Sequence, residues 1–163
     1  MPYKAAILTA SDKGAAGERE DLSGMELETL LTEMGFSILC RKILPDERAI
    51  IASALTDICD NQKADLVLTT GGTGFSPRDV TPEATRDVIH REAPGIPEAM
   101  RQFSLKITDR AMLSRGVAGI RGNTLIINLP GSLKAVRECF GVIRPVLPHT
   151  LEILTGQGGE CGN

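Results

Sequence analysis

The feature that most constrains the fold is an apolar run that ends in glycines. Residues 64–70 (ADLVLTT) lack the regular polar alternation of a half-exposed strand, which indicates a strand covered on both faces. The run leads into Gly71, Gly72 and Gly74, whose missing Cβ atoms allow positive φ angles and let a ligand contact main-chain N–H groups. A helix is expected over residues 82–92, with Thr81 as its N-cap.

The rest of the chain repeats this succession of strand, loop and helix. Apolar runs predict strands at 3–9, 36–43, 116–120 and 123–129, and apolar spacing predicts helices at 24–34, 47–61, 96–107 and 133–154, the last one bent or divided at Pro145 and Pro148. This alternation is typical of an α/β fold with three layers, α/β/α, around a mostly parallel sheet. The two short runs at 116–120 and 123–129 predict an antiparallel edge pair.

Length and composition restrict the class of protein. With 163 residues and 42% hydrophobic residues, the chain predicts one globular domain at 1–155, followed by a Gly-rich tail at 156–163. A net charge of -3 and the absence of Trp make nucleic acid an unexpected partner. No run approaches the ~18 apolar residues of a membrane span, and no signal peptide is recognised, so we expect no membrane and a cytoplasmic location. The four cysteines, which form no CxxC pair, are expected to be reduced and mostly buried: Cys40, Cys59, Cys139 and Cys161.

Three polar or glycine-containing loops follow predicted strands, at residues 11–23, 71–79 and 128–132. Ligands of open α/β sheets bind outside the carboxyl ends of the strands, so we expect these loops to meet in one pocket. The loop at 11–23 fits a binding role or a solvated, mobile segment equally well. Ser11 and Asp12 are its strongest functional candidates because they lie nearest the strand.

The glycine-rich loop contains neither GxGxxG nor GxxxxGK[ST], which excludes an ordinary dinucleotide or Walker site. It can offer N–H groups to an anion, with Asp79 able to hold a divalent cation and Arg78 able to offset phosphate charge. The alternative is a tight turn in which Asp79 pairs with Arg78 or caps Thr81. Asp46 precedes the predicted helix at 47–61, and from the residues alone its preferred role is that of a helix cap.

The two histidines do not indicate catalysis. His90 lies at the end of one predicted helix and His149 in another, and neither has a nucleophile nearby in the sequence. Helical surface positions or satisfied packing are the favoured interpretation.

Four segments resemble the molybdenum-cofactor biosynthesis family that binds molybdopterin. They are PDE at 45–47, TTGGTGFSPRDVTPEAT at 69–85, SLKIT at 104–108 and MLSRGVAGIRGNTLIINLPGS at 112–132. The resemblance covers almost the whole chain, from Lys4 to about Leu154. A stand-alone chain of this length is similar to the molybdopterin adenylyltransferases of the MogA type and the equivalent domains of plant and animal fusion proteins, rather than to the larger molybdenum insertases.

This resemblance implies a molybdopterin-binding-domain-like fold and a reaction. The reaction would be the transfer of AMP from ATP to the terminal phosphate of molybdopterin, with Mg²⁺ as cofactor and pyrophosphate as product. Asp46 and Asp79 match the family's two essential aspartates, catalytic and metal-binding, so Asp46 would be more than a cap. Matching substrate- and nucleotide-binding positions are Ser11, Gly71, Gly72, Thr73, Gly74, Ser104, Asn128, Pro130 and Gly131.

The resemblance also implies a homotrimer and contact with a molybdenum insertase. One departure is at 130–133, where larger fusion proteins often have PGNP and this chain has PGSL, which weakens the assignment of nucleotide contacts there. Two alternatives remain open. The chain could be a MoaB-like carrier or regulatory protein that binds the pterin without adenylylation, or a nucleotide-binding domain with a structural role.

Overall fold

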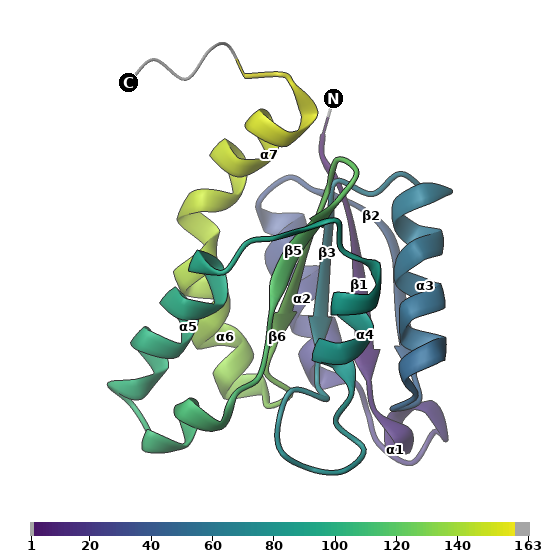
Figure 1. Cartoon of the computed structure of the whole chain (residues 1–163), viewed down its shortest axis with the longest axis vertical. Helices are drawn as coiled ribbons and strands as arrows, with labels where there is room; N and C mark the ends of the chain where they lie inside the picture. The colour runs from purple at the N-terminus through teal and green to yellow at the C-terminus, as the bar shows by residue number, and fades with distance from the viewer. Residues whose placement is uncertain (1, 159–163) are drawn as a thin grey trace.

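The computed structural model describes residues 2–158 and contains one six-stranded sheet in the order β2-β1-β3-β6-β5-β4 (Figure 1). β1, β2, β3 and β6 run parallel, whereas β5 is antiparallel to both β6 and β4. The strands are β1 Lys4–Ala10, β2 Ser37–Leu44, β3 Leu66–Thr70, β4 Arg91–Glu92, β5 Ala118–Arg121 and β6 Thr124–Leu129. The mostly parallel sheet with an antiparallel edge is therefore confirmed.

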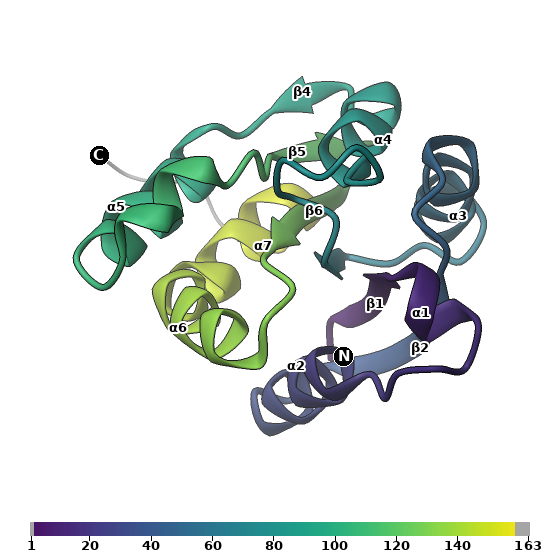
Figure 2. The same cartoon turned by 90° about the horizontal axis from the view of Figure 1, so that it is seen from below.

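Helices cover both faces of this sheet (Figure 2). The α-helices are α1 Asp12–Ala15, α2 Leu22–Glu33, α3 Arg48–Asp60, α4 Thr81–Val88, α5 Gly95–Leu105, α6 Leu133–Ile143 and α7 Leu147–Thr155, and the 3-10 helices are η1 Asp109–Leu113 and η2 Arg144–Val146. One core lies between the sheet and α2, α5, α6 and α7, and a smaller core lies between the sheet and α3 and α4. The three-layer arrangement is confirmed.

The strand register explains the two cores. Ile7, Leu68 and Ile127 are paired across three neighbouring strands and belong to the larger core, whereas the preceding residues of β3 and β6, Val67 and Ile126, belong to the smaller one. Successive side chains of a strand point to opposite faces. Because both faces are buried, the strands are continuous apolar runs.

Two local expectations need correction, and a third is confirmed. The helix expected at 82–92 ends at Val88, because the His90 N–H donates to the Ile120 carbonyl and residues 91–92 pair with β5 as a strand. Val80, and not Thr81, is the N-cap of α4. The expected division of the last helical segment is confirmed, because η2, which contains Pro145, separates α6 from α7, and Pro148 lies in the first turn of α7.

The described cysteines are free thiols. Cys59 and Cys139 are buried and Cys40 is partly buried, as expected for small apolar side chains, while the prediction for Cys161 and most of the 156–163 tail lies outside the described residues. Within residues 2–158, no helix combines the length and hydropathy needed to cross a bilayer.

Candidate functional site

The three predicted loops meet at the carboxyl ends of β1, β3 and β6, around a cavity of ≈ 560 Å³. Six of the expected site residues line it: Ser11, Asp46, Gly71, Gly72, Asp79 and Gly131. Ser132 also lines it, as the N-cap of α6, and accepts a hydrogen bond from the Ala135 N–H at 3.2 Å. The N-terminus of α6 therefore opens into the cavity, and such helix ends favour anions.

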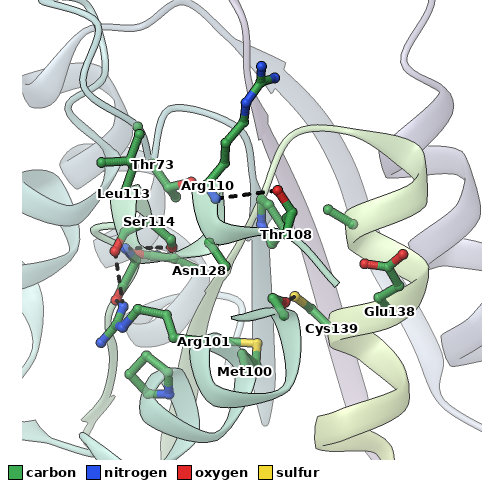
Figure 3. A pocket seen from close by; sticks show the side chains of 17 residues that line it. Thr73, Met100, Arg101, Thr108, Arg110, Leu113, Ser114, Asn128, Glu138 and Cys139 are labelled. Carbon is green, nitrogen blue, oxygen red and sulfur yellow. Dashed lines mark hydrogen bonds between the residues drawn. The ribbon is translucent and has the colours of Figure 1, made fainter. Parts of the chain in front are cut away.

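A second cavity, of ≈ 270 Å³, is lined by the remaining residues that the sequence predicted for the site (Figure 3). These are Thr73, Gly74, Ser104, Asn128 and Pro130. Its lining also includes apolar groups from α5 and η1, among them Met100 and Leu113, together with the buried Cys139. Gly72 and Thr73 belong to different cavities, as do Pro130 and Gly131. The two loops thus form a wall between the cavities.

The wall depends on glycine. Gly71 and Gly72 have φ angles of +89° and +68°, and a Cβ on Gly71 would lie 2.5 Å from the Ala10 carbonyl oxygen. A Cβ on Gly131 would lie 3.3 Å from Gly71 Cα. The glycines therefore permit both the left-handed turn and the close approach of the two loops. Within residues 2–158, the N–H groups of Gly72, Thr73 and Gly74 donate to no protein acceptor.

Asp46 has two oxygens in different environments. Its Oδ2 accepts a hydrogen bond from the Asp12 N–H at 2.9 Å. Its Oδ1 is buried and has no hydrogen-bond partner within the described chain. Burial, followed by the negative charges of Asp12 and Asp79, raises the pKa of the Asp46 carboxyl. A buried carboxylate oxygen without a donor is a position that a cation would satisfy.

Asp46 is not a helix cap. The N-cap position of α3 is Glu47, which makes no side-chain capping bond. The local sequence rule fails here because the partner of Asp46 is Asp12, from the first predicted loop.

Asp79 faces the same region from the glycine-rich loop. A Cβ on Gly74 would lie 2.9 Å from Asp79 Oδ2, and a Cβ on Gly72 would lie 3.2 Å from Asp46 Oδ1. Asp79 Oδ2 also accepts a hydrogen bond from the Ser76 N–H at 3.1 Å. Asp79 pairs neither with Arg78 nor with Thr81, whose hydroxyl donates to the Gly71 carbonyl at 3.0 Å.

The Asp46 and Asp79 carboxylates can bind Mg²⁺ only together with ligands from a substrate. Within residues 2–158, no group of three or more His, Cys, Asp and Glu side chains could hold a metal by itself. Mg²⁺ is commonly bound through one or two carboxylates together with the phosphates of a substrate. The donor set therefore fits a cation that arrives with a nucleotide, rather than one held in an all-protein cage.

Asn128 lines the second cavity, but the protein uses its amide group. Its Nδ2 donates to the Thr69 and Thr85 hydroxyls at 3.0 and 2.9 Å, and its Oδ1 accepts from the Val117 N–H at 3.1 Å. Asn128 is 1% exposed. It therefore ties β3, β6 and α4 together behind the cavity. Ser104, in contrast, has a hydroxyl that lies 3.7 Å from Cys139 Sγ at the cavity itself.

Three comparisons with known proteins place this geometry in a family. Residues 6–149 match the family described as "Probable molybdopterin binding domain". The chain belongs to this molybdopterin-binding domain family. It is 45% identical over 152 residues to the molybdopterin adenylyltransferase of Helicobacter pylori J99, which covers 92% of this chain and 86% of that protein.

Solved structures agree with this family assignment. The structure of the molybdopterin biosynthesis enzyme MoaB from Thermus thermophilus has a TM-score of 0.89 and 48% identity, covering 94% of this chain and 97% of that one. A MogA structure has a TM-score of 0.89 and 40% identity, covering 93% of this chain and 99% of that one. Proteins named MoaB and proteins named MogA both occur among the structural neighbours of this chain, so the fold alone does not distinguish these two types.

Sequence reasoning overlooked one residue of this molybdopterin-binding domain. Arg115 Nε donates to the Gly74 carbonyl and its Nη2 to the Asp79 carbonyl, both at 2.8 Å, while its Nη1 contacts Glu83. Arg115 thus supports the glycine-rich loop from behind. It lies inside the MLSRG segment, which was the available signal, but nothing local connects it with Asp79, 36 residues away.

Proposed function

We propose that the protein is a molybdopterin adenylyltransferase that transfers AMP from ATP to the terminal phosphate of molybdopterin. The observation that carries this proposal is the buried Oδ1 of Asp46, which has no partner in the described part of the chain and lies beside Asp79, at a cavity bordered by glycine loops and the N-terminus of α6. The family and the name of the Helicobacter pylori relative support the reaction class.

The reaction joins two phosphates. An oxygen of the terminal phosphate of molybdopterin attacks the α-phosphorus of ATP, the bond between that phosphorus and the oxygen bridging to the β-phosphate breaks, and pyrophosphate leaves with that oxygen. Such transfers depend mainly on in-line positioning and on neutralisation of charge. The larger, more polar cavity would hold the phosphates of ATP, and the second cavity would hold the flat pterin. The phosphate of the pterin would meet ATP at the boundary between the two cavities, beside Gly72 and Thr73.

Each proposed role follows from the chemistry of a group. Asp46 and Asp79 would hold Mg²⁺, which when bound neutralises phosphate oxygens and the charge of the leaving group. The N–H groups of Gly72, Thr73 and Gly74, which donate to no acceptor within residues 2–158, would donate to phosphate oxygens. Ser11, Gly71 and Gly131 would border the nucleotide, while Ser104, Asn128 and Pro130 would border the pterin.

The proposal also covers the location, the oligomeric state and the protein partner. We place the reaction in the cytoplasm, with the protein acting as a homotrimer and passing the adenylylated pterin to a molybdenum insertase. The location follows the expectation drawn from the sequence itself, and the other two points rest on the resemblance to the family.

The test is pyrophosphate release from purified protein supplied with molybdopterin, ATP and Mg²⁺. Asp79→Asn is expected to lower the rate by about 10²–10³-fold, the usual effect of losing one electrostatic contact to a reacting phosphate or oxyanion. Asp87→Asn is the matched control, because Asp87 is an exposed carboxylate paired with Arg48 on the outer side of α3 and α4.

A binding-only, MoaB-like protein would behave differently. It would bind molybdopterin without ATP, release no pyrophosphate alongside an active relative, and lose nothing in the Asp79→Asn variant. That combination of results would replace the proposed function with the alternative.

A further inference from the structure

An exposed ion pair joins Arg78, in the loop that carries Asp79, to Asp12, the first residue of α1, which is hydrogen-bonded to Asp46. Arg78 Nε lies 3.0 Å from Asp12 Oδ2, and Arg78 Nη2 lies 3.0 Å from Asp12 Oδ1. This is the two-pronged geometry that an arginine and a carboxylate prefer. Arg78 Nη2 also lies 3.7 Å from Glu47 Oε1. The charge of Arg78, expected from the sequence to face phosphate, is directed in this structure at Asp12 and Glu47.

Asp12 is tied to Asp46 by two reciprocal hydrogen bonds. The Asp12 N–H donates to Asp46 Oδ2, and the Asp46 N–H donates to Asp12 Oδ1, both at 2.9 Å. The first bond holds one oxygen of the Asp46 carboxylate and leaves Oδ1 without a partner among the described residues. Asp12 therefore determines which oxygen of Asp46 is presented to the cavity.

The same ion pair acts on Asp79, because Arg78 is the residue before it. On the inner side, Arg115 holds the carbonyls of Gly74 and Asp79. On the outer side, within the described residues, the hydrogen bonds and ion pairs between residues 75–79 and the segments around Asp12 and Asp46 all come from Arg78. Loss of Arg78 would leave the loop attached to one side of the site.

We propose that Asp12 and Arg78 are positioning residues that hold the Asp46 and Asp79 carboxylates at the separation a divalent cation requires. This inference rests on the proposed function, since it assigns the two carboxylates to one metal. As positioning residues, Asp12 and Arg78 would not touch the reacting phosphates. Their side chains are 43% and 55% exposed, so the pair adds little to the stability of the fold, and its loss acts locally.

The experiment measures metal binding without turnover. Free Mn²⁺ is followed by electron paramagnetic resonance while the protein is titrated in the presence of α,β-methylene ATP, which cannot release pyrophosphate. Asp12→Asn keeps an oxygen for the Asp46 N–H but removes the charge facing Arg78, and Arg78→Gln removes the other partner. Each is expected to weaken Mn²⁺ binding by about tenfold or more, as is usual for residues that orient metal ligands.

The double variant tests whether the two residues act as one unit. If Asp12 and Arg78 act through their ion pair, the double variant binds Mn²⁺ about as weakly as either single variant. Arg78→Lys, which keeps the charge but not the planar fork, should recover part of the affinity. Arg48→Gln is the matched control, because it breaks a similar exposed pair with Asp87, and it should leave Mn²⁺ affinity unchanged.

Two results would overturn the inference. One is unchanged Mn²⁺ affinity in Asp12→Asn and Arg78→Gln, in proteins whose circular dichroism matches that of the unchanged protein. The other is weaker binding of the ATP analogue in Arg78→Gln alone, with effects that add in the double variant, which would assign Arg78 to a phosphate. Asp46→Asn separates this failure from failure of the proposed function: full Mn²⁺ binding and turnover in that variant would contradict the metal site itself.

Discussion

At the residue scale, the ionised carboxylate of Asp46 destabilises the fold but has a proposed role as a metal ligand. Among residues 2–158, its buried Oδ1 has no hydrogen-bond partner, and burial and the neighbouring carboxylates raise the pKa of the Asp46 carboxyl. A group whose folded-state pKa is raised destabilises the fold when it is ionised. The protein without ligand therefore retains a carboxylate that opposes folding, as is common at sites that await a charged ligand.

Asp46→Asn is accordingly expected to lose activity and gain stability. Asparagine imitates the neutral acid, so without metal or nucleotide its free energy of unfolding should exceed that of the unchanged protein at pH 7. The gain should be complete above the raised folded-state pKa and vanish as the pH falls towards the ordinary value of 3.8. Urea denaturation across this pH range measures it.

Asp87→Asn is the control for this measurement, because Arg48 lowers the pKa of Asp87. That variant should show no gain at pH 7. A loss of stability in Asp46→Asn at pH 7 would contradict the account and would indicate a structural role for the Asp46 carboxylate.

At the element scale, the sequence specified the strands and the turn glycines but not what holds the loops. Continuous apolar runs revealed β1, β3 and β6 because burial on both faces leaves a strong local pattern. The end of α4 was misjudged because pairing of residues 91–92 with β5 overrode the helical pattern. The contacts of Asp12 with Asp46 and of Arg115 with Asp79 join residues more than 30 positions apart, and no local rule detects such partners.

The turn after β3 gives a prediction at this scale. Gly71→Ala should lower the free energy of unfolding by about 2 kcal/mol or more, because a side chain is strained at φ +89° and its Cβ would meet the Ala10 carbonyl at 2.5 Å. Pyrophosphate release should fall as well, since Gly71 borders the nucleotide cavity. Guanidinium denaturation and the activity assay measure the two effects.

Gly141 supplies the contrasting substitution. It lies inside α6, has an ordinary φ angle, and its Cβ would meet nothing within 4 Å. Gly141→Ala should therefore stabilise the protein by about 0.5–1 kcal/mol and leave the reaction unchanged. If Gly71→Ala and Gly141→Ala changed the free energy of unfolding equally, the strain inferred for a side chain at position 71 would be contradicted.

At the scale of the whole molecule, the resemblance predicted more of the site than the residues did. Residue patterns alone indicated three loops that meet in one pocket, an anion-binding turn and the Asp79 carboxylate, whereas the matching motifs added a functional role for Asp46 and specific binding residues in the loop at 128–132. The division of these residues between two cavities required the structure, because it depends on which side of the wall formed by the two loops each group faces.

The proposed homotrimer gives the last prediction. Large apolar side chains are well exposed at the end of α5, in the segment that follows it and in η1. They are Phe103, Leu105, Ile107, Met112 and Leu113. Gathered exposed groups of this kind mark association surfaces, so we expect this one to contact another copy of the chain. Sedimentation equilibrium should give three times the chain mass of 17.4 kDa, and Met112→Asp should reduce it to one, because a charge cannot be buried there without a partner. Ile50→Asp, at a 43% exposed position of α3 on the other face of the sheet, should leave the mass threefold; a threefold mass for Met112→Asp as well would contradict this surface.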